Sequence, residues 1–249
     1  MIIHAFDDSS EAVFGPGDFY GEKQELCELC IVTFSNRIFE ELQRRLPHRA
    51  VASVDSANGE RPIFLTELNG RSAVFYLSQI GSTLCGSDLI EVNWLTGATK
   101  FILFGSAGSL DSAATAGKYV LPTEAYRDEG MSYHYAPPAD YIRIRNSDRM
   151  AELFTALKLP YVQGRIWTTD AVYRETREQI RRRLAEGCLA VEMEIAGVQA
   201  VCDYYGWELY PFLATGDALD GEAYDPTGLP SANHCLDKLD VALEIAARI

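Results

Sequence analysis

A nearly unbroken apolar run with two carboxylates at its centre constrains the fold of this chain more than any other feature. The run is Cys188-Leu-Ala-Val-Glu-Met-Glu-Ile-Ala-Gly-Val-Gln-Ala-Val201, and its acids are Glu192 and Glu194. Such runs normally lie in a core, where an unpaired carboxylate is destabilising by several kcal/mol. Two interpretations stay open. Either the run crosses a pocket floor where a ligand supplies hydrogen-bond donors, or both acids are structural, neutralised by arginine or capping the following helix.

The charge of the chain limits its partners. The 249 residues include 22 Lys and Arg against 36 Asp and Glu, a net charge of −14. This surface repels nucleic-acid backbones and anionic membranes, so we expect neither nucleic acid nor membrane as a partner. No stretch approaches the roughly 20 apolar residues that span a membrane, and the N-terminus lacks the segments of a secretory signal. We therefore expect a cytoplasmic protein in which a few local donors hold any anionic substrate.

The six cysteines fit a reducing compartment. Cys27 and Cys30 form a C-x-x-C pair, but a zinc site needs a second ligand pair, and none of the four histidines supplies one. A redox pair would open a helix after a strand, whereas this pair leads into the strand-like Cys30–Phe34. We therefore expect no metal and no redox cofactor.

Strand-like and helical patterns alternate along the chain, which predicts an α/β fold with helices on both faces of a mixed sheet. Strand-like runs occur at Cys30–Phe34, Pro62–Leu68, Ser72–Ser78, Phe101–Phe104, Lys118–Pro122, Ile142–Arg145, Tyr161–Trp167, Cys188–Val191 and Leu209–Ala214. Helical patterns occur at Asn36–Leu46, Thr83–Leu95, Asp148–Leu157, Arg174–Leu184, Glu194–Tyr205 and His234–Ala247. No linker rich in Pro, Gly or Ser divides the chain, so we expect residues 1–249 to form a single domain.

Four segments that follow predicted strands carry polar groups, and ligands gather at the carboxyl ends of strands in such sheets. In Gly105–Ser109, backbone N–H groups and the Ser106 hydroxyl can bind an anion or a sugar hydroxyl, although a simple tight turn is the alternative. The second segment, Arg127–Tyr135, is dense in polar and aromatic side chains. It is either part of a site or a solvated loop.

The other two segments place an aromatic ring and an acid at the same edge. In Trp167–Thr176, Thr169 or Asp170 is expected to cap the following helix, and Tyr173 in the first turn would stack on a planar ligand. In the last segment, Asp217 stands just beyond a strand, where partial burial would raise its pKa and suit it to proton transfer. A turn-forming or capping role is the alternative for Asp217.

In this order, the four segments resemble the nucleoside phosphorylase family, which includes purine nucleoside phosphorylases, uridine phosphorylases and related nucleosidases. The resemblance runs from about Ile80 to Gly221 and is strongest at Gly105-Ser-Ala-Gly108, Arg127-Asp-Glu-Gly-Met-Ser-Tyr-His134, Thr168-Thr-Asp170 with Tyr173-Arg-Glu-Thr176, and Val191-Glu-Met-Glu194. It implies a single α/β domain whose central mixed sheet closes partly into a barrel. It also implies a homo-oligomer such as a dimer or hexamer.

The resemblance implies a role for the acids of the apolar run. The Glu194 carboxylate would grip the 2′- and 3′-hydroxyls of a ribose, which favours the positive charge that builds on the sugar as its N-glycosidic bond breaks. Met193 would pack on the sugar, with Glu192 close behind.

At the base, the resemblance assigns Asp217 to N7 of a departing purine, as hydrogen-bond partner or proton donor. Tyr173 stands at the position of one member of an aromatic pair beside the base. Val172 stands at the position of the other member, which is often phenylalanine in the family. Gly216 occupies a position that is often serine in the purine enzymes. The pattern favours a purine nucleoside as substrate.

The phosphate site is where the chain departs from the family. Ser106 and Gly105 keep the turn that contacts phosphate in the family. Thr33-Phe-Ser-Asn-Arg37 replaces the Gly-Asp-Pro-x-Arg loop of phosphorylases, so Arg37 is the candidate stand-in for the arginine of that loop. Leu103 replaces a strand arginine, and arginine is the usual bidentate ligand of a dianion. Candidate substitutes are Arg61, Arg127 and Arg174.

Three functions are compatible with this pattern. We expect the first, a pentosyltransferase that uses phosphate as co-substrate, needs no cofactor, and converts a nucleoside to free base and ribose 1-phosphate. The second is a hydrolytic nucleosidase, which Leu103 favours, although the turn near Ser35 lacks the water-activating acid of such enzymes. The third is a nucleoside-binding protein without turnover, against which the presence of both Glu194 and Asp217 argues.

Overall fold

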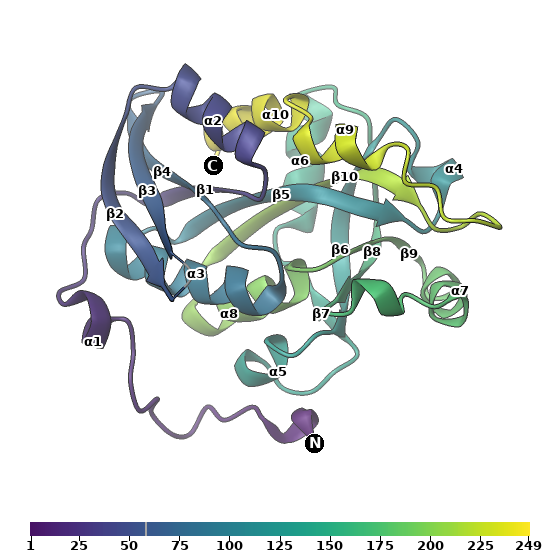
Figure 1. The fold of residues 1–249 in the computed structure, drawn as a ribbon, viewed down its shortest axis with the longest axis horizontal. Coiled ribbons are helices and arrows are strands. Elements are labelled where there is room, and N and C mark those ends of the chain that lie inside the picture. The colour runs from purple at the N-terminus through teal and green to yellow at the C-terminus, as the bar shows by residue number, and fades with distance from the viewer. Residues whose placement is uncertain (58) are drawn as a thin grey trace.

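The computed structural model describes residues 1–57 and 59–249, and its elements surround one mixed β-sheet (Figure 1). The strands are β1 (Leu29–Thr33), β2 (His48–Ser56), β3 (Gly59–Leu68), β4 (Arg71–Leu77), β5 (Lys100–Ser109), β6 (Tyr119–Asp128), β7 (Tyr141–Arg143), β8 (Tyr161–Thr169), β9 (Cys188–Glu192) and β10 (Glu208–Ala218). The helices are α1 (Gly17–Tyr20), α2 (Asn36–Arg45), α3 (Ser82–Thr96), α4 (Ser112–Thr115), α5 (Ser132–Tyr135), α6 (Ser147–Ala156), α7 (Arg177–Ala185), α8 (Ile195–Tyr205), α9 (Leu229–His234) and α10 (Asp237–Ala246). Two 3-10 turns are η1 (Ile2–His4) and η2 (Val172–Arg174).

The sheet closes on itself in part. Its strand order is β10-β6-β8-β9-β5-β1-β4-β3-β2, with β7 paired to β6, and β10 also pairs with β5. This additional pairing joins β10, β6, β8, β9 and β5 into a ring, while β1, β4, β3 and β2 extend from β5 as an open sheet. The expected α/β fold, with a mixed and partly barrel-like sheet flanked by helices, is therefore confirmed.

Each face of the sheet carries its own hydrophobic core because strand side chains alternate between the two faces. In β1, Cys30 and Val32 belong to one core, and Leu29 and Ile31 belong to the other. Helices α3 and α8 cover the first core, and α2, α6 and α10 cover the second, on opposite sides of the sheet in Figure 1. The two layers bury β1 and the first half of β5 on both sides, which holds the ends of these strands in place.

Several strands run further than the sequence patterns predict. β5 continues to Ser109, so the small residues expected to form a turn are strand residues paired with β9 and β10. β10 continues through Asp217 to Ala218. The sequence analysis also missed β2, a largely exposed strand at the edge of the sheet. Glycine, serine and polar edge residues carry little strand propensity of their own, and here the neighbouring strands impose the extended conformation.

The helix after β8 begins later than predicted. Neither Thr169 nor Asp170 caps it, because Thr169 ends β8, and Asp170 Oδ2 accepts a 2.9 Å hydrogen bond from the N–H of Gly130. The N-cap of α7 is Thr176, which forms a capping box with Gln179. The intervening segment is therefore a loop with one 3-10 turn rather than the first turn of a helix.

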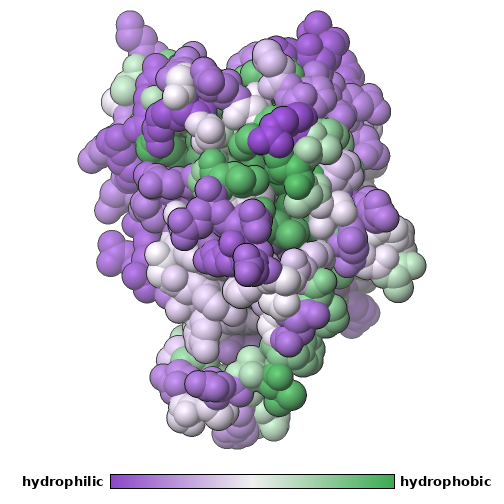
Figure 2. Space-filling model, turned by 90° about the vertical axis from the view of Figure 1, so that its left-hand side faces the viewer, coloured by the Kyte–Doolittle hydropathy of each residue, from purple (hydrophilic) through white to green (hydrophobic). Residues whose placement is uncertain are grey.

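The surface has both polar and apolar regions. Figure 2 shows a mainly hydrophilic face with a band of hydrophobic side chains across its middle. The segment before β1 runs along the outside of the sheet (Figure 1) and exposes Val13, Phe14 and Phe19. This exposure is compatible with the expected homo-oligomer, which stays a prediction.

In the described part of the chain, no helix has the length and apolar character needed to cross a bilayer.

Helices α3 and α8 approach each other at a glycine. A Cβ on Gly197 of α8 would lie 2.6 Å from the Cβ of Ser82, at the start of α3. The Ser82 hydroxyl donates hydrogen bonds to the carbonyl oxygens of Met193 (3.0 Å) and Glu194 (3.3 Å). The absence of a side chain at Gly197 therefore lets α3 lie directly against the connection between β9 and α8.

The substitution Gly197→Ala is expected to lower the free energy of unfolding by about 1–3 kcal/mol, because the added methyl group overpacks this contact. Helix propensity alone predicts the opposite sign, since alanine is favoured over glycine by about 1 kcal/mol inside a helix. Urea denaturation measures the difference. The control is Gly15→Ala, whose new Cβ meets nothing within 4 Å. A variant at Gly197 as stable as the wild type would show that the contact is not tight.

Candidate active site

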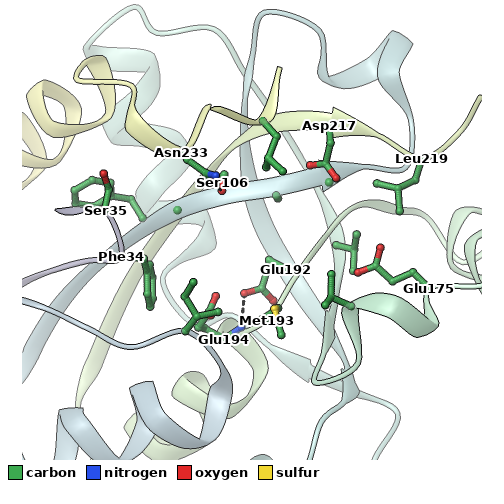
Figure 3. A pocket seen from close by; sticks show the side chains of 18 of the residues that line it. Phe34, Ser35, Ser106, Glu175, Glu192, Met193, Glu194, Asp217, Leu219 and Asn233 are labelled. Carbon is green, nitrogen blue, oxygen red and sulfur yellow. Dashed lines mark hydrogen bonds between the residues drawn. The ribbon is translucent and has the colours of Figure 1, made fainter. Parts of the chain in front are cut away.

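A cavity of about 850 Å³ opens at the carboxyl ends of β1, β5, β9 and β10, bordered by η2, α9 and α10 (Figure 3). Eight residues singled out in the sequence line it: Gly105, Ser106, Val172, Tyr173, Glu192, Met193, Glu194 and Asp217. Arg37, the ninth, is exposed on α2 and does not line the cavity. The fold therefore gathers the predicted site residues into one place, with this one exception.

Different chemical groups occupy different parts of the cavity. In Figure 3, Ser35, Ser106 and Asn233 lie on one side of the cavity, here called the hydroxyl end, and Asp217, Leu219 and Glu175 lie on the other, here called the acid end. Glu192, Met193 and Glu194, here called the middle, lie across the cavity from Ser106 and Asp217. The acids of the apolar run thus face both a group of neutral donors and acceptors and a second pair of acids.

Glu192, the last residue of β9, has its carboxylate fully occupied by the protein. Its Oε2 accepts hydrogen bonds from the backbone N–H groups of Glu194 (2.7 Å) and Ile195 (2.8 Å), and its Oε1 accepts one from the Thr168 hydroxyl. The side chain therefore satisfies free N–H groups at the start of α8. For Glu192, the structure agrees with the capping interpretation of the apolar run.

Glu194 is held differently. Its Oε1 accepts a 2.6 Å hydrogen bond from the N–H of Gly81, and the backbone of Met193 also stabilises the anion. Among residues 1–57 and 59–249, no lysine, arginine or histidine forms an ion pair with it. For Glu194, the structure agrees with the pocket interpretation, since its carboxylate lines the cavity and no cation of the described residues neutralises it.

Burial raises the pKa of both Glu192 and Glu194 above the ordinary glutamate value, because surroundings poor in water penalise the anion. For Glu194, the negative charge of Glu192 increases the pKa further, and the hydrogen bond from Gly81 opposes this increase. A ligand that donates hydrogen bonds to Glu194 would replace the missing water and favour the charged form.

Asp217 reaches the cavity because β10 lies against a glycine of β5. Asp217 pairs with Gly108, and a Cβ at Gly108 would lie 3.3 Å from Asp217 Oδ2 and 2.5 Å from Leu219 Cδ1. A Cβ at Gly105 would meet its nearest neighbour at an ordinary 3.7 Å. Gly108 is therefore the glycine of this segment that the close approach requires.

The sequence analysis missed a second acid at the acid end. Glu175 follows η2, lines the cavity, and has a pKa raised to about 7 by burial, with a smaller contribution from the charge of Asp217. A hydrogen bond also joins the side chains of Tyr224 and Asp217. Up to about pH 7, Glu175 therefore keeps a proton. The sequence around Glu175 is polar, and such a sequence does not distinguish an acid that lines a cavity from an acid exposed to solvent.

Tyr173 and Val172 border the cavity at its rim. Tyr173 is 97% exposed and Val172 is 46% exposed, because η2 projects from the end of β8 instead of opening a helix. The aromatic ring that was expected beside a planar ligand therefore stands at the entrance in the isolated chain.

The hydroxyl end contains groups of the C-terminal segment that the sequence analysis missed. The Ser106 hydroxyl donates a hydrogen bond to Asn233 Oδ1, and Ser35 Oγ lies 2.8 Å from His234 Nδ1. Lys238, in the first turn of α10, also lines the cavity. The helical pattern of the C-terminal segment predicts a helix, but it does not predict that the first residues of that segment contact Ser35 and Ser106.

The arginines proposed as phosphate ligands lie elsewhere. Arg61 pairs with Asp88 at 2.5 Å, and Arg127 donates hydrogen bonds within its own loop. Arg174 is exposed and does not line the cavity. Leu103, at the position of the family's strand arginine, is buried in the core beneath α3 and α8. The candidate substitutes therefore do not supply a guanidinium at the hydroxyl end.

The cysteine pair and possible metal ligands lie outside this arrangement. Cys27 and Cys30 are free thiols, and burial raises the pKa of each, which disfavours the reactive thiolate. Across the described ranges 1–57 and 59–249, no three His, Cys, Asp or Glu side chains are grouped to hold a metal ion.

The substitution Glu194→Gln is expected to stabilise the ligand-free protein by an amount that grows with pH. The pKa of Glu194 is higher in the folded than in the unfolded protein, so the folded state binds more protons and becomes less stable as pH rises above about 4.5. Glutamine stays neutral and still accepts the Gly81 N–H.

Thermal unfolding between pH 5 and 9 measures this effect. The Glu194→Gln variant should match the wild type near pH 5 and exceed its stability on the order of 1–3 kcal/mol at pH 8. The exposed Glu11→Gln serves as control. Parallel pH profiles of the wild type and Glu194→Gln would contradict the assignment of a buried, unneutralised acid.

Comparison with known proteins relates these features to a family. Residues 28–248 match the phosphorylase superfamily. A purine nucleoside phosphorylase DeoD-type of Caldanaerobacter subterraneus subsp. tengcongensis is 30% identical over 158 residues, which cover 60% of this chain and 66% of that enzyme. A 5′-methylthioadenosine/S-adenosylhomocysteine nucleosidase of Actinobacillus succinogenes is 30% identical over 178 residues, covering 66% of this chain and 76% of that enzyme.

A solved structure shares the fold. The crystal structure of the Campylobacter jejuni 5′-methylthioadenosine/S-adenosylhomocysteine nucleosidase superposes with a TM-score of 0.72 at 17% identity, covering 90% of this chain and all of the other. The chain spans between 59% and 66% of the length of the first three curated relatives that it matches. Because the matched region includes the whole sheet and every residue that lines the cavity, the chain belongs to the phosphorylase superfamily.

Proposed function

We propose that the protein cleaves the N-glycosidic bond of a purine nucleoside with phosphate, releasing free base and ribose 1-phosphate. The observation that carries the proposal is the arrangement of groups in one cavity, where Glu194 lies across from the hydroxyl end and the acid end. A nucleoside has matching groups, since its sugar carries hydroxyl donors, its base accepts a proton, and its C1′ is attacked from the side opposite the base.

The sugar would lie in the middle of the cavity. Glu194 keeps acceptor capacity that the protein does not use, and the 2′- and 3′-hydroxyls of ribose are donors that fit it. Met193 lines the cavity beside it and offers a polarisable apolar surface to the sugar. As the bond to the base breaks, positive charge builds on the ribose, and a nearby carboxylate stabilises that charge.

The base would lie at the acid end. In the proposed step, a phosphate oxygen forms a bond to C1′ while the C1′–N9 bond breaks, and the electron pair of that bond leaves with the purine. A proton from the acid end, where Glu175 is protonated up to about pH 7, passes through Asp217 to N7 and neutralises the departing base.

The second candidate is hydrolysis, with water in place of phosphate. It is favoured by the positions of the candidate arginines, which lie away from the hydroxyl end, and by a nucleosidase among the relatives.

Base release from inosine, adenosine and uridine, each measured with and without phosphate, distinguishes the candidate functions. Phosphate-dependent release supports phosphorolysis, and release that ignores phosphate supports hydrolysis. Nucleoside binding without release would indicate a binding protein.

The substitution Asp217→Asn is expected to reduce kcat for purine release by roughly a hundredfold or more, because a general acid contributes about 10²- to 10⁴-fold to a rate. Affinity for the nucleoside should change much less. Steady-state kinetics with chromatographic detection of the free base measures both quantities. The exposed Glu222→Gln, in the loop that follows, is the control. Unchanged turnover in Asp217→Asn would remove Asp217 from the mechanism.

A further inference from the structure

We propose that Lys238, assisted by His234 and Ser106, binds the phosphate co-substrate at the hydroxyl end of the cavity. This assignment deepens the function proposed above and depends on it. It gives the cation of the phosphate site to the C-terminal helix, whereas the resemblance places the phosphate-binding arginines at positions that are Arg37 and Leu103 in this chain.

The amine of Lys238 is buried and pairs with no carboxylate of residues 1–57 and 59–249. The Lys238 side chain is only 1% exposed, yet it lines the cavity. Cys235 interacts with the amine electrostatically, but within the same described ranges no acceptor takes a hydrogen bond from it. Lysine is almost never fully buried unless it is paired. A buried amine of this kind that borders a cavity is therefore suited to bind an anion.

The surrounding groups fit an oxyanion. Ser35 and Ser106 supply hydroxyls, and their present partners are His234 Nδ1 and Asn233 Oδ1. With Nδ1 of His234 occupied by Ser35, the other ring nitrogen is left for a ligand. At the acid end, the Asp217 carboxylate would repel an anion. The charge distribution thus directs phosphate to the hydroxyl end.

The position of Lys238 depends on a departure from the family pattern. Gly216 stands on β10 where the purine enzymes often have serine, and a Cβ there would lie 2.7 Å from the Cβ of Ala232 and 2.9 Å from the Cα of Leu229. The glycine therefore lets α9 lie directly on β10. This contact carries His234 to Ser35 and starts α10 beside the cavity. The glycine that replaces the usual serine on β10 thus allows the packing that places Lys238 of α10 beside the cavity.

The charge state of Lys238 suits the role. Burial lowers its pKa to about 8, which leaves the amine mostly protonated at pH 7. A bound phosphate would stabilise the charged form further, because an opposite charge nearby favours ionisation. Lysine is a common phosphate ligand that acts as a compact point charge, without the bidentate geometry of arginine.

The substitution Lys238→Met tests the proposal, because methionine keeps the apolar stem and removes the charge. The expected result is a KM for phosphate raised about tenfold or more, as for the loss of a charged hydrogen bond. The KM for the nucleoside should stay within about twofold, since ribose and base contacts are untouched. Lys23→Met, on the exposed segment before β1, is the matched control and should change neither value.

A binding measurement keeps the test independent of turnover. Phosphate should raise the Tm of the wild type above that in chloride of equal ionic strength, because a ligand that binds only the folded state stabilises it. This rise should disappear in Lys238→Met and persist in Lys23→Met. Circular dichroism verifies folding, and Lys238→Gln replaces the methionine variant if that protein does not fold.

The outcomes separate this inference from the proposed function. A wild-type phosphate KM, or an undiminished rise in Tm, in Lys238→Met overturns the assignment. If base release does not depend on phosphate and phosphate does not change the wild-type Tm, the assignment of Lys238 is overturned. That result would still support cleavage of the N-glycosidic bond. A phosphate-dependent Tm that requires Lys238, in a protein that cleaves no nucleoside, supports the anion site and overturns the proposed reaction.

Discussion

The hydrogen bonds between Glu192 and the start of α8 position the rest of the cavity. Two N–H groups and the Thr168 hydroxyl converge on this one carboxylate. A helix N-terminus carries unsatisfied donors and a partial positive charge, which makes it one of the few places where a buried acid is tolerated. The chain therefore turns from β9 into α8 within two residues. Met193 and Glu194 occupy that turn, and the Ser82 hydroxyl and the Gly81 N–H hold it from the side of α3.

Two buried ionisable side chains line this cavity without an ion-pair partner in the described part of the chain. Within residues 1–57 and 59–249, Glu194 pairs with no cation and Lys238 pairs with no carboxylate. An isolated buried charge destabilises a protein, and strongly perturbed ionisable groups cluster at functional sites. A ligand that carries hydroxyl donors beside one and negative charge beside the other would relieve both.

Close backbone contacts at two glycines make this arrangement possible. Gly108 lets β10 bring Asp217 and Leu219 against β5, and Gly216 lets α9 lie on β10. A larger residue at either place would push apart elements that supply opposite ends of the cavity. Ser106 of the hydroxyl end pairs with Ala214, and Asp217 of the acid end pairs with Gly108, so both ends are built on the same strand pair, β5 and β10.

The sequence by itself determined the alternation of strands and helices and the mixed sheet, because apolar periodicity is a local property of the chain. Its short motifs also predicted a candidate site around Glu194, Met193 and Asp217, which line one cavity. Strand ends were less predictable, since the glycine and serine residues of β5 are extended only because β9 and β10 pair with them. Only the tertiary structure decided that Glu192 caps a helix while Glu194 faces the cavity. Only the tertiary structure also brought in Glu175, His234 and Lys238. The Ser35–His234 contact joins residues 199 positions apart, and no local pattern encodes a neighbour that packing alone creates.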